Sequence, residues 1–196
     1  MNGSTANASK EWAVFLKEAL ANPRAVGAVF PSSPALARRM ARMTVMEDVE
    51  DLVVELGAGT GAVTEALLAR GVPARQLIAI ERSPALADLL RARFPGIRVV
   101  CGDAVHLRRL LRHLGTGGAR INIVSSLPLR SLPPKQVHSI LKEIGGVLRS
   151  GGRWIQFTYA LVGRQIPRGF AREASSLVWR NLPPARVDVF ARAVTV

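Results

Sequence analysis

Residues 53–61 read Val-Val-Glu-Leu-Gly-Ala-Gly-Thr-Gly, and this stretch decides the fold of the chain. The β-branched residues favour a strand. The three alternating glycines predict a tight turn, because glycine adopts backbone conformations that other residues avoid. A helical pattern begins at Ala62. A strand, a glycine turn and a helix N-terminus together indicate a site where a nucleotide-like cofactor lies against bare backbone.

Strands and helices alternate along the rest of the chain. Strands are predicted at residues 52–56, 76–81, 97–100, 121–125 and 153–159, and two more at 177–181 and 186–194 around a Pro-Pro turn. Helices are predicted at residues 8–21, 34–43, 62–70, 84–94, 104–114 and 134–148. Apolar strands that alternate with helices predict an α/β fold with a mostly parallel sheet covered on both faces. The last two strands predict an antiparallel C-terminal hairpin.

The composition narrows the classes of partner. The net charge is +13, and residues 104–196 carry 15 Lys and Arg but only three acidic residues. Nucleic acid and anionic lipid headgroups are the partners that such a surface favours. The single cysteine, Cys101, excludes a disulfide framework and fits a reducing compartment. The three histidines lack the spacing of metal ligands, so no metal is expected.

Acidic residues near the glycine turn point to one cofactor. Glu55 precedes the glycines, where a carboxylate repels a pyrophosphate but suits the ammonium of S-adenosylmethionine. Glu81 ends the second strand and is predicted to accept from both ribose hydroxyls, while Asp103 follows the third strand and suits the adenine amino group. The full set of predicted cofactor-binding residues is Glu55, Gly57, Gly59, Gly61, Glu81, Arg82, Asp103, Ala104 and Ser125.

With these motifs, residues 50–194 resemble the class I S-adenosylmethionine-dependent methyltransferases. The resemblance implies a Rossmann-like fold with a seven-stranded sheet. We expect residues 49–196 to form this domain, and residues 1–48 to supply an amphipathic helix and a segment that covers the substrate and cofactor. Transfer of the methyl group is expected to be an in-line displacement, which depends on orientation of the acceptor.

The segment after the fourth strand bears on the methyl acceptor. Residues 126–129 read Ser-Leu-Pro-Leu, whereas the rRNA adenine dimethyltransferases carry an aromatic residue at the fourth position, where it stacks on a flipped adenine. Leu129 cannot supply that stack. Together with residues 27–33 (Gly-Ala-Val-Phe-Pro-Ser-Ser) and 157–159 (Phe-Thr-Tyr), this segment resembles the bacterial phospholipid N-methyltransferases of the PmtA type.

That resemblance implies N-methylation of phosphatidylethanolamine to its mono-, di- and trimethylated products, the last being phosphatidylcholine. Tyr159 and Ser126 are the expected catalytic residues, with the tyrosine ring facing the cationic amine. The expected substrate-binding residues are Phe30, Leu127, Pro128, Tyr159, Arg164 and Arg168.

The predicted first helix carries an apolar stripe formed by Trp12, Phe15, Leu16 and Leu20. Such a stripe suits either an interfacial helix or packing on the domain, and the resemblance favours membrane docking. The expected location is therefore cytoplasmic, peripheral on the inner face of the cell membrane. A phospholipid and an anionic membrane surface are the expected partners, without nucleic acid. Two alternatives stay open: an rRNA or DNA adenine N6-methyltransferase, and a cofactor-binding interaction module without transfer activity.

Overall fold

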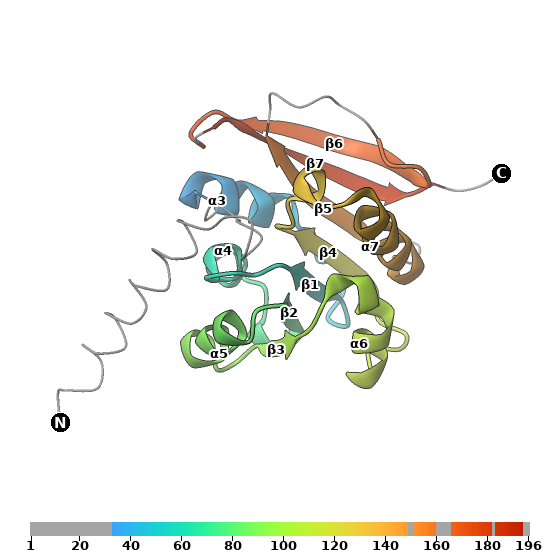
Figure 1. Cartoon of the computed structure of the whole chain (residues 1–196). Helices are drawn as coiled ribbons and strands as arrows, with labels where there is room; N and C mark the ends of the chain where they lie inside the picture. Colours follow the sequence, from blue (N-terminus) through green and yellow to red (C-terminus); the bar gives the residue numbers. More distant parts are fainter. Residues whose placement is uncertain (1–32, 149–150, 160–165, 182, 194–196) are drawn as a thin grey trace. The chain divides into compact units, whose positions relative to one another are not determined.

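The structure is a computed structural model that describes residues 33–148, 151–159, 166–181 and 183–193. In this part of the chain, seven strands form one sheet in the order β3-β2-β1-β4-β5-β7-β6 (Figure 1). The strands are β1 (Leu52–Leu56), β2 (Leu77–Glu81), β3 (Arg98–Cys101), β4 (Ile121–Ser125), β5 (Arg153–Tyr159), β6 (Phe170–Val178) and β7 (Ala185–Arg192). The first five strands run parallel, and β7 is antiparallel to both β5 and β6. The predicted fold class is confirmed.

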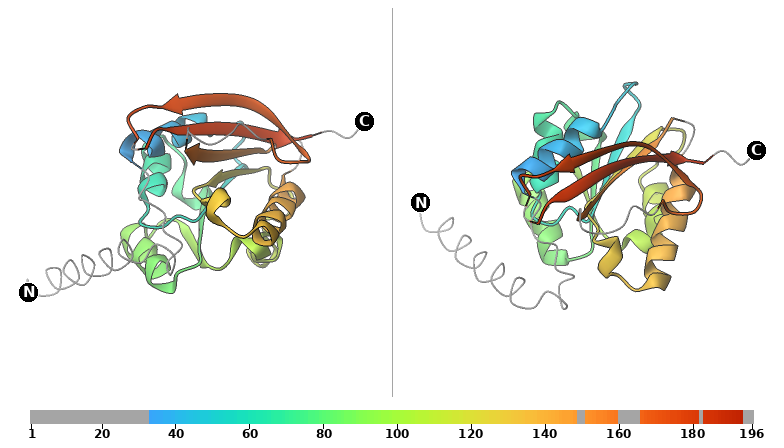
Figure 2. Two further views of the ribbon diagram at one scale, coloured as in Figure 1. Left: turned by 45° about the horizontal axis from the view of Figure 1, so that its top comes forward. Right: turned by 90° about the horizontal axis from the view of Figure 1, so that it is seen from above.

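Helices cover both faces of the sheet, on opposite sides in the two views of Figure 2. Neighbouring strand residues point to opposite faces, so Val53 packs with helices α3 and α4, whereas Val54 packs with α6 and α7. The helices are α3 (Pro34–Met43), α4 (Ala62–Ala69), α5 (Pro84–Arg93), α6 (Leu107–His113) and α7 (Pro134–Val147). In the described residues, three short 3-10 turns join them to the strands: η1 (Ala74–Gln76), η2 (Ala104–His106) and η3 (Leu129–Ser131).

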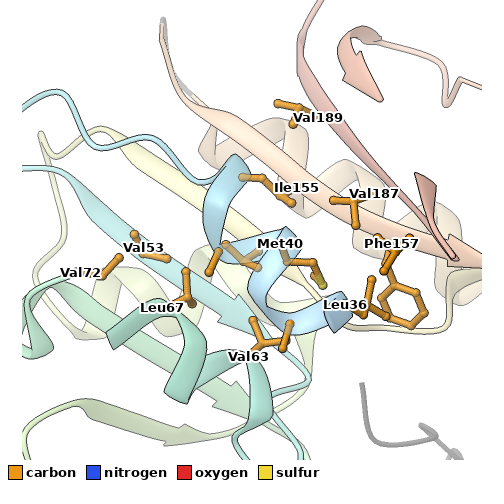
Figure 3. Close-up of a cluster of buried hydrophobic side chains, with 14 of the residues drawn as sticks. Leu36, Met40, Val53, Val63, Leu67, Val72, Ile155, Phe157, Val187 and Val189 are labelled. Atoms are coloured by element: carbon orange, nitrogen blue, oxygen red, sulfur yellow. The ribbon is translucent and has the colours of Figure 1, made fainter. Parts of the chain in front are cut away.

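Helix α3 covers one face of β5 and β7. Ser33 caps it, since its hydroxyl accepts the N–H of Leu36 (3.2 Å), and Pro34 occupies the first helical position as predicted. Leu36 and Met40 are fully buried in the cluster drawn in Figure 3, which includes side chains from both strands. Residues 1–32 lie outside the described residues, so the division of the chain after residue 48 stays a prediction.

An ion-pair cluster fastens the amino ends of the strands. Arg120 donates to Asp51 (Nε to Oδ1, 2.9 Å) and to Glu47 (Nη1 to Oε2, 2.5 Å), and Arg153 reaches the other oxygen of Glu47 (3.1 Å). Burial alone would raise the pKa of Asp51, but the hydrogen bonds from Arg120 hold that pKa below its ordinary value. These contacts connect the segments where the strands begin, at the opposite end of the strands from the glycine turn.

The predicted boundaries need correction in the C-terminal half. The sixth strand is β6, from Phe170 to Val178, and not residues 177–181. It is an edge strand with charged residues between its buried ends, which hides the apolar pattern but discourages pairing with other chains. The helix predicted at 104–114 is divided into η2 and α6, because the Asp103 side chain caps a 3-10 turn first. Within the described ranges, no helix is both long and apolar enough to span a bilayer.

Candidate active site

The glycine turn lies at the carboxyl end of β1. Gly57, Gly59 and Gly61 have φ values of +70°, +57° and +87°, which side chains rarely tolerate. A Cβ on Gly57 would lie 2.7 Å from Cδ2 of Leu127, and one on Gly61 would lie 2.4 Å from Cε2 of Phe94. A Cβ on Gly59 would meet nothing within 4 Å. Two glycines therefore permit close packing, and the third faces open space where a ligand can approach the backbone.

Glu81 lies directly beside this turn at the end of β2. Its Oε2 accepts the N–H of Gly59 (3.0 Å), and its Oε1 accepts the N–H of Ser83 (2.9 Å). The side chain is only 8% exposed, so its orientation is fixed before any ligand arrives. Each oxygen keeps a second lone pair, which suits the predicted contact with vicinal hydroxyls.

Glu55 lies below the turn, inside β1, and is fully buried. Thr64 of α4 donates its hydroxyl to Oε2 (2.6 Å), whereas Oε1 has no hydrogen-bond partner among the described residues. Burial raises the pKa of this carboxyl to about 7. The sequence indicated a carboxylate at this position, but neither its depth nor its partner Thr64.

The end of β3 is joined to the same edge. The N–H of Gly102 donates to the carbonyl of Glu81 (2.9 Å). Asp103 uses Oδ1 to accept the N–H of Val105 (3.0 Å), and Ala104 is buried behind it. Arg82 lies in the β2–α5 connection with an exposed side chain, and its carbonyl is 3.8 Å from Sγ of Cys101. The N–H of Val105 therefore orients the Asp103 side chain, and Asp103 lies at the same end of the parallel strands as Glu81.

The segment after β4 closes the other side of the turn. Ser126 donates its N–H to the carbonyl of Leu56 (2.9 Å), and Ser125 accepts the N–H of Leu127 (3.3 Å). The hydroxyl of Ser126 is buried and has no partner among the described residues. Pro128 then leads into η3. The sequence-predicted residues Ser125 to Pro128 thus lie together beside Gly57.

Gln156 of β5 supports this segment and was missed by the sequence analysis. Its Nε2 donates to the carbonyl of Leu127 (3.0 Å) and to that of Phe157 (2.7 Å), and Oε1 lacks a partner among the described residues. It pairs in register with Ser125. An amide flanked by apolar residues, in Trp-Ile-Gln-Phe, was the available signal.

Tyr159 ends β5 on the same edge of the sheet. Its ring meets that of Phe157 edge-on, with 5.7 Å between the ring centroids, and burial raises the pKa of its hydroxyl. Arg168 lies elsewhere. It comes just before Phe170, which pairs with Arg192 at the end of the sheet where the parallel strands begin. The structure therefore does not bring Arg168 to this site. Six predicted site residues fall outside the described residues: Trp12, Phe15, Leu16, Leu20, Phe30 and Arg164.

The strand order, the antiparallel seventh strand and the glycine turn flanked by Glu81 and Asp103 define a class I S-adenosylmethionine-dependent methyltransferase. Residues 53–152 match a protein family described as a methyltransferase domain, and the chain belongs to that family. S-adenosylmethionine is its methyl donor. In the described part of the chain, no group of three His, Cys, Asp or Glu side chains is arranged to hold a metal ion.

Two curated relatives differ in how much of each protein is shared. An ornithine lipid N-methyltransferase of Singulisphaera acidiphila is 35% identical over 181 residues, which is 90% of this chain and 93% of the relative. A ribosomal RNA small subunit methyltransferase A of Rhodopseudomonas palustris (strain HaA2) is 41% identical over 128 residues, or 62% of this chain. That match spans only 42% of the ribosomal RNA enzyme.

Solved structures support the fold alone, because their identities are low. A 1,6-didemethyltoxoflavin-N1-methyltransferase of Burkholderia thailandensis superimposes with a TM-score of 0.61 at 17% identity, covering 99% of this chain and 92% of that one. A TehB-like methyltransferase of Corynebacterium glutamicum gives a TM-score of 0.58 at 17% identity, covering 96% of this chain and 100% of the other.

Proposed function

We propose that the chain transfers a methyl group from S-adenosylmethionine to the amine of a lipid headgroup. The similarity to the ornithine lipid N-methyltransferase carries this proposal, because it extends over nearly the whole of both proteins. Phosphatidylethanolamine, which the sequence motifs suggest, is one acceptor, and an ornithine lipid is the other. Both headgroups offer a primary amine beside an anionic group, a phosphate in the first and a carboxylate in the second.

The residues around the glycine turn suit the cofactor. Open space beside Gly59 admits a ligand, Glu81 and Asp103 offer oriented carboxylates, and Oε1 of Glu55 is a buried acceptor without a partner among the described residues. We assign ribose binding to Glu81 and adenine binding to Asp103 and Ala104. When bound, S-adenosylmethionine supplies an electrophilic methyl group on its sulfonium.

The acceptor amine needs a lone pair that points at this methyl group. We assign its alignment to the hydroxyl of Ser126, which is buried without a partner among the described residues, and to the backbone of Leu127, which Gln156 holds in place. An ammonium loses its proton more readily in a poorly solvated site. The half-buried ring of Tyr159 can face the cationic product.

The test is transfer of label from S-adenosylmethionine to a panel of acceptors. Purified protein is incubated with vesicles that contain phosphatidylethanolamine or an ornithine lipid, with vesicles of phosphatidylcholine alone, and with ribosomal RNA. We expect label in at least one amine lipid and none in phosphatidylcholine. Label in RNA alone would contradict the proposal.

A ribosomal RNA adenine is the second candidate acceptor, because of the 41% identity to the ribosomal RNA enzyme. Leu129 argues against it, since a leucine cannot stack on a flipped base as an aromatic residue does. A Leu129→Phe variant separates the two acceptors. If the chain acts on lipid, this change gives no transfer to RNA; if it acts on RNA, the new ring increases that transfer.

A further inference from the structure

The turn between β6 and β7 exposes a large aromatic side chain. Trp179 follows β6 directly and is 73% exposed, and Leu177 is 44% exposed. Val178, between them, is buried, and the two exposed side chains line the same hollow on the surface. Isolated exposed apolar residues are ordinary, but neighbouring ones that face solvent together indicate a contact surface.

Arginines surround these apolar side chains. A hollow of about 530 Å³ is lined by Trp179 and Leu177 together with Arg38 and Arg42 of α3 and Arg180 of the turn. These three arginines have exposed side chains and no ion pair with a described acidic residue, whereas Arg120 and Arg153 at the opposite edge are paired. The surface therefore offers unneutralised positive charge beside exposed apolar area, which we call the hairpin surface.

The hairpin surface and the candidate active site both lie at the end of the sheet where the parallel strands finish. Val178 and Tyr159 both pair in register with Ala185 of β7. Two strand spacings separate them, which is about 10 Å. The N–H of Ser33 also donates to Oδ1 of Asn181 (3.4 Å), which holds the start of α3 against the turn. A flat partner on this edge would meet the hairpin surface and the active site together.

We propose that the hairpin surface docks the enzyme on a bilayer that contains anionic lipid, with Trp179 and Leu177 inserted among the headgroups and the three arginines facing lipid phosphates. Tryptophan is favoured at this depth, and clustered arginine is attracted to anionic lipid. This contact is separate from the predicted helix at residues 8–21. Its purpose rests on the proposed function, since docking brings a lipid amine to the edge that carries Tyr159.

Tryptophan fluorescence tests the insertion directly. The chain has three tryptophans, and Trp154 is only 1% exposed, so a Trp12→Phe variant leaves Trp179 as the reporter at the surface. The vesicles contain phosphatidylglycerol and phosphatidylcholine that carries bromine on its acyl chains close to the headgroup, where the bromine quenches an inserted tryptophan on contact. We expect quenching and a blue shift in Trp12→Phe, and neither in the double variant that also carries Trp179→Phe. Bound protein without quenching, or no binding at all, overturns the proposal.

Matched variants test the chemistry of the surface. Trp179→Ala is expected to weaken vesicle binding about tenfold, whereas Val49→Ala, at a residue that is 73% exposed before β1, should not change it. Arg42→Gln should weaken binding in low salt, and Arg112→Gln on α6 should not. Equal effects within either pair would contradict the proposal. Quenching of Trp179 by RNA and not by vesicles would assign the surface to nucleic acid instead.

Activity on a short-chain, water-soluble amine lipid separates this inference from the proposed function. Trp179→Ala should keep full activity on that substrate while losing activity on vesicles. If the parent enzyme methylates no amine lipid but Trp179 is quenched, the proposed function fails and the docking surface stands. If it methylates the lipids without quenching, the docking surface fails alone.

Discussion

Replacing Glu55 with glutamine should stabilise the cofactor-free protein above neutral pH. The carboxyl is fully buried, and one of its oxygens has no hydrogen-bond partner among the described residues. Burial raises its pKa from 4.5 to about 7 in the folded protein. The folded state therefore binds the proton more tightly than the unfolded state does. The stabilisation from this group is fully present below about pH 4.5 and is lost as the pH rises through about 7.

The size of the effect follows from the pKa difference. Each pKa unit corresponds to about 1.4 kcal/mol, so the free energy of unfolding of the parent protein should fall by about 3 kcal/mol, relative to Glu55→Gln, between pH 4.5 and 8. Urea unfolding followed by circular dichroism measures both proteins across this range. The difference between the two removes the contribution of the histidines, which titrate in both proteins.

Two results would refute this reasoning. A stability difference that stays constant from pH 4.5 to 8 would mean that Glu55 does not titrate in this window. If the parent protein gained stability relative to Glu55→Gln as the pH rises, the stability difference would change in the direction opposite to the one predicted. Thr64→Val serves as a second variant, because it removes the hydroxyl that donates to Oε2 of Glu55 (2.6 Å). This change should raise the pKa of Glu55 further, so the loss of stability should occur at a higher pH.

Three further outcomes are expected. Glu81→Ala removes the acceptor of the Gly59 N–H and the proposed ribose ligand, so calorimetry should show at least tenfold weaker binding of S-adenosylmethionine, and unchanged affinity would remove Glu81 from the site. Gly57→Ala should lower the free energy of unfolding by about 2 kcal/mol because of the contact with Leu127 and the positive φ, and a loss as small as that of Gly59→Ala would contradict the packing argument. Tyr159→Phe should lose activity modestly and Tyr159→Ala strongly on amine-lipid vesicles, and full activity of Tyr159→Ala would exclude the cation-binding role.

Much of the fold was predictable because each parallel strand is a short apolar run bounded by glycine, proline or a capping residue. Strand β1 and its turn illustrate this. The apolar run up to Leu56 forms the strand, and the three alternating glycines after it form the turn. Strand β6 was not predictable from the same signal. It lies at the edge of the sheet, so its side chains between Phe170 and Val178 are mostly exposed and carry no apolar alternation.

The candidate site was predictable where a residue follows a strand of the parallel sheet, because all such ends meet at one edge. Glu81, Asp103 and Ser126 follow this rule. Gln156 and Thr64 were missed, since they support the site from within a strand and a helix and depend on tertiary contacts. Arg168 was selected by charge alone, and charge does not say at which end of an antiparallel hairpin a residue lies.

The most direct test of the proposed function is mass spectrometry of the acceptor. The purified chain is incubated with S-adenosylmethionine that carries a deuterated methyl group and with mixed vesicles of phosphatidylethanolamine, an ornithine lipid and phosphatidylglycerol. We predict that the deuterated methyl group appears on the headgroup nitrogen of an amine lipid and that, at S-adenosylmethionine concentrations below saturation, Glu81→Ala lowers its yield at least tenfold. Methylation of RNA with no change in any lipid headgroup would contradict the proposed function.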